Sequence, residues 1–164
     1  MKRERQLVID YVDYESPEEL EPLDRELVQE AIRAQEGSYS PYSHFRVGAA
    51  LRLEDGTIVR GANQENNAYP AGLCAERTAM FHAGAYYPNT AFDTIAIVGS
   101  DSNGICETPA TPCGECRQVM AEYQTKFGKP LKIILVGRNK IQKFFKVDDI
   151  LPFIFESLKA GEVF

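Results

Sequence analysis

Apolar and polar positions along the chain follow helical spacing in some segments and extended spacing in others. Helical spacing runs from Leu20 to Ala34, and Gly37 follows as a stop signal for this helix. Further helices are expected at 74–85, a segment rich in alanine, and from 112 to about 126. The stretches between these helices have the character of strands.

Short apolar runs with β-branched residues predict the strands. The runs 47–53 and 57–60 flank Asp55-Gly56, which is a strong hairpin signal. Further strands are expected at 94–98, 131–136 and 141–147. Because strands alternate with helices, the pattern predicts an α/β fold in which helices cover both faces of a mixed sheet.

The two ends of the chain carry weaker patterns. Residues 1–22 are polar and acidic apart from the alternating stretch 7–12, which predicts an edge strand or a loose arm. Near the C-terminus, the acidic pair 148–149 is expected to cap a last helix with Pro152 in its first turns. The predicted organisation is an N-terminal extension, 1–22, followed by one domain, 23–164.

Composition and charge narrow the class of protein. The 164 residues suit one compact domain, and 44% hydrophobic with 26% charged residues is an ordinary globular balance. No apolar run approaches the roughly 18 residues of a membrane span, and no signal peptide is visible, so we expect a cytoplasmic protein with no membrane partner. A formal net charge of −6 without a Lys/Arg cluster disfavours nucleic acid as a partner and favours a small neutral substrate.

Cysteine is the residue type that indicates chemistry. Without a secretory signal, Cys113-x-x-Cys116 points to a metal or redox site rather than to a disulfide. Cys113 and Cys74 both lie at predicted helix starts, where free N–H groups stabilise thiolates, and Cys116 shares a helical face with Cys113. Three thiolates favour Zn²⁺ and leave a fourth position for water. Cys106 as a fourth ligand would instead close the site and make it structural.

Glu76 and Arg77 favour the open, catalytic arrangement. A carboxylate two residues after Cys74 can take a proton from a zinc-activated water and pass it on. The Arg77 guanidinium can donate to the sulfurs and offset the thiolate charge that weakens zinc as a Lewis acid. Taken alone, both residues would be solvated charges on a helix. Together with Pro-Cys-x-x-Cys, they match the signature of zinc deaminases.

Four sequence blocks resemble the cytidine deaminase family, in its small homotetrameric branch with three cysteine ligands. They cover most of the chain, from about Leu23 to Phe155, and comprise residues 39–50, 63–66, 74–79 and 112–118. The resemblance implies a three-layer α-β-α fold with a five-stranded mixed sheet and one Zn²⁺ per chain. It also implies hydrolytic deamination of cytidine or deoxycytidine to uridine or deoxyuridine and ammonia.

The same resemblance implies roles for residues around a nucleoside substrate. Phe45 would pack against the pyrimidine ring, while Asn63 and Glu65 would bind the ribose hydroxyls. The backbone around Ala75 and the carboxylate of Glu76 would hold the edge of the base. Residues 63 and 65 are two apart on an extended segment, so their side chains point to one face and suit paired hydroxyls.

The apolar segment near the C-terminus predicts that the chain forms an oligomer. Large apolar residues crowd the segment 151–155, and a helix that is apolar nearly all round should be buried. A contact in a symmetric homotetramer would bury it. The resemblance adds that Phe155 reaches a neighbouring chain's pocket and stacks on the base. The alternative is that this segment completes the chain's own core.

Some residues depart from the family pattern, and other functions remain alternatives. Gln64 and Asn67 replace residues that are usually apolar or small, and Glu115 replaces a small one. The alternatives are a deaminase of another small nucleoside such as blasticidin S or of bases in nucleic acid, a non-catalytic module with a structural zinc, and a thiol–disulfide protein. The last leaves Cys74-x-Glu76 unexplained.

Overall fold

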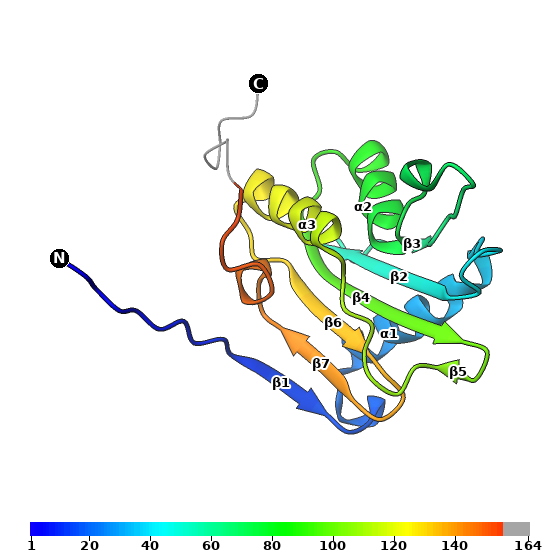
Figure 1. The fold of residues 1–164 in the computed structure, drawn as a ribbon, viewed down its shortest axis with the longest axis horizontal. Helices are drawn as coiled ribbons and strands as arrows, with labels where there is room; N and C mark the ends of the chain where they lie inside the picture. Colours follow the sequence, from blue (N-terminus) through cyan, green and yellow to red (C-terminus); the bar gives the residue numbers. More distant parts are fainter. Residues whose placement is uncertain (156–164) are drawn as a thin grey trace.

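A computed structural model describes residues 1–155 of the chain. Its centre is a mixed sheet with the strand order β1-β7-β6-β4-β2-β3, and β5 pairs with β4 (Figure 1). Only β4 and β6 are parallel, and the other described pairs are antiparallel. The strands are β1 (Tyr11–Tyr14), β2 (Arg46–Leu53), β3 (Ile58–Ala62), β4 (Phe92–Asp101), β5 (Gly104–Ile105), β6 (Lys132–Val136) and β7 (Ile141–Phe144).

Within residues 1–155, three α-helices cover the two faces of the sheet. Helix α1 (Pro22–Ala34) lies on one face, and α2 (Ala75–Tyr86) and α3 (Gly114–Phe127) lie side by side on the other (Figure 1). The predicted three-layer α/β architecture is therefore confirmed. The helices predicted at 20–34, 74–85 and 112–126 and the predicted hairpin are also confirmed, with their ends moved by one or two residues.

Side-chain alternation along the strands fills two cores. Ile95 and Ile97 pack on the side of α2 and α3, whereas Ala96 and Val98 pack on the side of α1. Successive side chains in a strand point to opposite faces, so a strand covered on both faces has an unbroken apolar sequence. This explains why the runs in β2, β4 and β6 show little alternation of apolar and polar residues.

The expected number of five strands was too low, because the sheet in the described part of the chain has seven. Both additional strands are short. Strand β1 pairs with β7 at the edge of the sheet, and the two-residue β5 turns back at Gly104, which has a φ of 97°, to pair with the end of the central strand β4. The strand predicted at 7–12 forms instead at Tyr11–Tyr14. Short edge strands carry little hydrophobic pattern, so the sequence marks them weakly.

The helix expected after the acidic pair 148–149 was wrong for the described residues. A 3-10 turn forms at Val147–Asp149, and 151–155 contain no helix. The Asp149 carboxylate accepts hydrogen bonds from the backbone N–H groups of Phe145 and Lys146. Pro152 then disfavours the helical region for the residue before it, so the turn is not extended. The remainder of the expected helix lies outside the described residues.

Gly61 lets the first turn of α2 pack closely against the sheet. A Cβ atom on Gly61 in β3 would lie 2.4 Å from the carbonyl oxygen of Ala75 and 2.4 Å from the backbone nitrogen of Ala79. Only glycine lets the first turn of α2 approach the sheet this closely.

Within residues 1–155, no helix combines the length and apolar character that a bilayer span requires.

Candidate metal centre and substrate pocket

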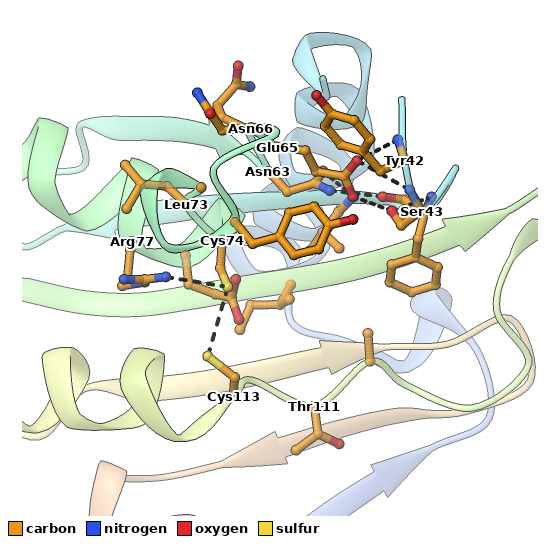
Figure 2. Close-up of a pocket in the computed structure, with 18 residues that line it drawn as sticks. Tyr42, Ser43, Asn63, Glu65, Asn66, Leu73, Cys74, Arg77, Thr111 and Cys113 are labelled. Atoms are coloured by element: carbon orange, nitrogen blue, oxygen red, sulfur yellow. Dashed lines mark hydrogen bonds between the residues drawn. The ribbon is translucent and has the colours of Figure 1, made fainter. Parts of the chain in front are cut away.

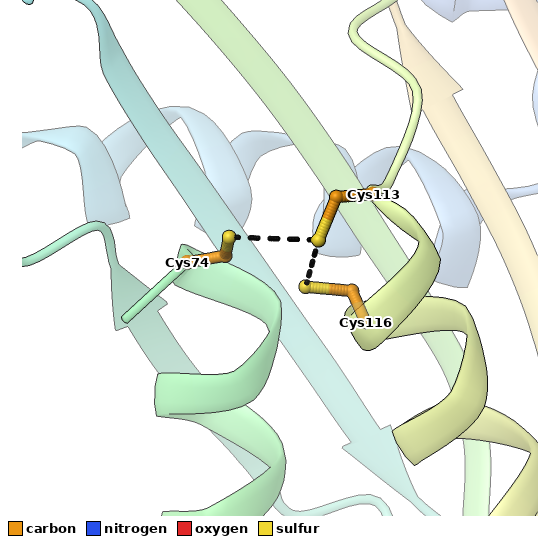
Figure 3. Close-up of side chains that lie close together, drawn as sticks. All are labelled: Cys74, Cys113 and Cys116. Atoms are coloured by element: carbon orange, nitrogen blue, oxygen red, sulfur yellow. Dashed lines mark hydrogen bonds between the residues drawn. The ribbon is translucent and has the colours of Figure 1, made fainter. Parts of the chain in front are cut away.

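Three cysteine sulfurs meet where α2 and α3 begin. Cys74 is the N-cap residue of α2, Cys113 is the N-cap of α3, and Cys116 lies in the first turn of α3 (Figure 3). The Sγ atoms of Cys74 and Cys113 are 3.8 Å apart, those of Cys113 and Cys116 are 3.5 Å apart, and all three lie within 4.8 Å of one another. The two predicted helix starts therefore deliver the three thiols to one point.

The cluster fits a tetrahedral zinc ion. Zinc–sulfur bonds of about 2.3 Å at tetrahedral angles place two sulfurs about 3.8 Å apart. The observed sulfur separations are close to this value. Cys106 does not belong to the cluster, so these residues provide three ligands and leave a fourth position open. This geometry favours the open site over the closed structural site.

The surroundings of the three thiols favour ionisation of the Cys74 thiol before the others. Cys74 accepts a hydrogen bond from Cys116 and, against the opposing effect of burial, this bond together with one from Arg77 lowers the pKa of Cys74 to about 5. Donating to the Cys74 thiolate raises the pKa of Cys116, and burial raises it further. Both helix N-termini add positive potential at the sulfurs. A cation bound by all three sulfurs would replace the protons that they share.

Glu76 is a buried carboxyl group beside the thiols. It follows the N-cap of α2 by two residues, and only 4% of its surface is exposed. Burial raises the pKa of Glu76 to about 7, and the nearby charge of Cys74 raises it in the same direction. Backbone hydrogen bonding opposes this shift. A carboxyl group with a pKa near neutrality can both take and give a proton, as general acid–base catalysis requires.

Arg77 lies between the sulfurs and a second acidic residue. Its Nη2 atom is 4.0 Å from Cys74 Sγ and 2.9 Å from a carboxylate oxygen of Glu115 (Figure 2 shows the contact with Cys74). Its Nε atom is buried and has no hydrogen-bond partner within residues 1–155. The predicted approach of this guanidinium to the thiolates is thus present in the structure.

A cavity of about 690 Å³ opens above the cluster. The structure brings together in its lining most of the residues predicted for the site: Phe45, Asn63, Glu65, Cys74, Glu76, Arg77 and Cys113. Cys116 and Ala75 lie beneath this lining and are fully buried. Phe155 is not part of the lining, and 79% of its surface is exposed.

Asn63 and Glu65 organise the mouth of this cavity. The Asn63 amide donates to the carbonyl oxygen of Phe45 at 2.9 Å, and its oxygen accepts from the Val47 N–H at 2.8 Å. The Glu65 carboxylate accepts from the Tyr42 N–H at 2.9 Å and from the Ser43 hydroxyl (Figure 2). The Ser43 hydrogen bond lowers the pKa of Glu65. Both side chains therefore hold the loop that carries Phe45, and each keeps hydrogen-bonding capacity for a ligand.

The lining includes residues that sequence reasoning did not assign. Tyr42 and Tyr69 stand edge to face with ring centroids 6.1 Å apart, and both line the cavity. Tyr42 and Ser43 lie inside the sequence block 39–50, so the neighbourhood of Phe45 was the available signal. Tyr69 lies in a short 3-10 turn, Tyr69–Ala71, that no hydrophobic pattern marks.

Comparison with known proteins gives a consistent result. Residues 22–127 match the family model of the cytidine and deoxycytidylate deaminase zinc-binding region. A cytidine deaminase from Halalkalibacterium halodurans is 52% identical over 102 residues, which cover 61% of this chain and 72% of that protein.

Solved structures show the same likeness. The crystal structure of cytidine deaminase from Burkholderia pseudomallei has a TM-score of 0.66 and 38% identity, covering 79% of this chain and 97% of that one. The crystal structure of cytidine deaminase from Mycobacterium tuberculosis has a TM-score of 0.63 and 31% identity, covering 80% and 96% respectively.

Proposed function

Because this chain belongs to the cytidine and deoxycytidylate deaminase family, we propose that it hydrolyses the exocyclic amino group of cytidine and deoxycytidine. The products are uridine or deoxyuridine and ammonia. The observation that carries the proposal is a buried carboxyl group, Glu76, beside three convergent thiols in a cavity of about 690 Å³. A cavity of this size accommodates a small molecule and buries most of its surface.

The cysteine cluster would hold one zinc ion through Cys74, Cys113 and Cys116. Zinc in such an open site supplies Lewis acidity, which lowers the pKa of water to about 7. Glu76 moves the protons: it passes the first proton of the attacking water to N3 of the ring, then takes the second from the new C4 hydroxyl group and delivers it to the departing amine. Burial keeps its pKa near 7, so both directions of transfer are accessible at neutral pH.

Other residues would hold and orient the nucleoside. Phe45 packs against the pyrimidine ring, and Asn63 and Glu65 bind the sugar hydroxyls from the cavity mouth. Ala75 is the first residue of α2, so its N–H has no partner within the helix and can hold the base edge. A substrate fixed in this way would present its C4 atom to Glu76 and to the cysteine cluster that would hold the zinc.

A substrate panel tests the proposal. We expect turnover of cytidine and deoxycytidine, followed by the loss of absorbance as the uracil product forms. We expect little turnover of CMP or of cytosine in single-stranded DNA, because the Glu65 carboxylate at the sugar end and the net charge of −6 repel phosphate. Rates on CMP that match those on cytidine would contradict this substrate assignment.

The proposal includes a homotetramer in which Phe155 serves a neighbouring site. Phe153 and Phe155 are 88% and 79% exposed in the single chain, which leaves two large aromatic side chains uncovered. The backbone near Phe155 is held, since Gln118 donates to its carbonyl oxygen at 2.9 Å. A partner subunit would cover these rings and bring Phe155 to the base.

A further inference from the structure

An ion pair crosses the same gap between α2 and α3 that the cysteine cluster crosses. Arg77 belongs to the first turn of α2, next to the Cys74 ligand, and Glu115 lies between the ligands Cys113 and Cys116 in the first turn of α3. Arg77 Nη2 lies 2.9 Å from Glu115 Oε2, and the same nitrogen lies 4.0 Å from Cys74 Sγ. One guanidinium nitrogen therefore faces both a carboxylate and a ligand sulfur.

We propose that Glu115 is a positioning residue that holds the Arg77 guanidinium against the Cys74 sulfur and thereby strengthens zinc binding. The inference rests on the proposed zinc site and assigns a role to a residue that departs from the family pattern. Three thiolates exceed the charge of Zn²⁺ by one, so a fixed cation at the sulfurs offsets the excess. The position of that cation then contributes to the affinity.

The contacts of Arg77 show why it needs an external anchor. Its side chain is only 18% exposed, but its buried Nε has no hydrogen-bond partner within residues 1–155. The sulfur contact at 4.0 Å is long, whereas the carboxylate contact at 2.9 Å is short. Arginine has many rotamers, so a guanidinium without its short contact spends more time turned away from the sulfur. Glu115 is the residue that supplies this contact.

The expected size of the effect follows from the exposure of Glu115. Its side chain is 72% exposed, and exposed ion pairs are individually weak. Partners of metal ligands nevertheless change metal affinity about 10- to 100-fold when they are removed. We therefore expect the zinc dissociation constant to rise about three- to tenfold in Glu115→Gln, between the small effect of an exposed ion pair and the larger effect of removing a partner of a metal ligand.

The experiment measures zinc affinity by competition with chelators of graded strength, so that tight and weak sites fall within one assay. The variants are Glu115→Gln, Arg77→Gln and the double variant, each in the full chain. Glu122→Gln is the matched control, because Glu122 is an exposed acid on the same helix and forms no ion pair within the described part of the chain. Thermal unfolding of each zinc-free protein checks that the fold is unchanged.

The double variant separates positioning from a direct effect of charge. If Glu115 acts through Arg77, Glu115→Gln weakens zinc binding in the wild-type background and has no effect in the Arg77→Gln background. Equal effects in both backgrounds, or no effect in the wild-type background, would overturn the proposal. A wild-type chain that binds no zinc would instead refute the proposed function, so the two failures are distinguishable.

Discussion

The Phe45 ring lies in a space that one glycine leaves open. A Cβ atom on Gly99 in β4 would lie 2.7 Å from Phe45 Cζ and 2.9 Å from the Cβ of Ala110. Phe45 and Ala110 both line the cavity, so this strand forms the floor beneath the ring. The hydrogen bond from Asn63 to the Phe45 carbonyl fixes the backbone on the other side. The position of the ring is therefore set from two directions.

Gly99→Ala tests whether this position matters for substrate binding. The added methyl group displaces the Phe45 ring into the cavity, so we expect KM for cytidine to rise about tenfold, equivalent to a loss of about 1.4 kcal/mol of binding free energy. Zinc content should stay unchanged. Gly37→Ala is the matched control, because its Cβ would meet its nearest neighbour at an ordinary 3.7 Å. An unchanged KM in Gly99→Ala would contradict the role given to Phe45.

At the scale of elements, a network of charges joins α1 to the sheet. The Arg52 guanidinium in β2 binds Asp24 of α1 at 3.0 Å and Asp93 of β4 at 2.9 Å. Lys132 of β6 binds Asp93 at 3.1 Å, and Lys143 of β7 binds Asp24. These residues come from five elements, so the network fixes the helix over four strands. It lies on the face opposite the metal centre.

Asp93→Asn should weaken this network. Desolvation opposes ionisation of Asp93, but hydrogen bonds from Thr94, Lys132 and Arg52 outweigh it and lower its pKa. The stabilisation is therefore fully present above the unfolded-state pKa, about 3.9, and is lost as the pH falls through the lower folded-state value. We expect the variant to lose about 1–3 kcal/mol of unfolding free energy at pH 7.

Denaturant unfolding at pH 7 and near pH 3 measures the difference in unfolding free energy between wild type and Asp93→Asn. The gap between wild type and Asp93→Asn should narrow in acid, because the wild-type carboxylate then takes up a proton. Asp10→Asn serves as the control, since Asp10 is exposed and precedes the first strand. A gap that stays constant from pH 7 to acid would show that the charge of Asp93 does not stabilise the fold.

The sequence predicted the elements that carry the site better than those at the edges. The helix starts at Cys74 and Cys113 were predicted because ligand spacing and helix signals coincide there. Strand β1 was misplaced, and the turn at Val147–Asp149 was missed because a strand to 147 and a helix after 148–149 were expected there. Short edge elements depend on tertiary pairing more than on local pattern. The contacts of Asn63 with the Phe45 loop were also missed, because they join residues 18 positions apart in a way that no spacing rule encodes.

For the whole molecule, the proposed homotetramer would cover the exposed rings of Phe153 and Phe155. Chains carrying Phe155→Ala, mixed with chains carrying Glu76→Gln, test whether Phe155 acts in a neighbour's site. Some mixed sites would combine an intact Glu76 with an intact Phe155 from the other chain, so activity should rise above the sum of the two parents. The same mixture prepared with Phe153→Ala is the control, and sizing chromatography measures the tetramer. No rise despite proven subunit exchange would place the whole pocket within one chain.

In the proposed mechanism, a zinc ion held by three cysteines and the carboxyl group of Glu76 together deaminate cytidine. The most direct test measures cytidine turnover and zinc content on the same samples of wild type, Glu76→Gln and Cys106→Ser. We predict one zinc per chain in all three proteins and wild-type turnover in Cys106→Ser. In Glu76→Gln we predict that turnover falls by about 10²–10⁴-fold. Wild-type turnover in zinc-loaded Glu76→Gln, or loss of zinc in Cys106→Ser, would refute this mechanism.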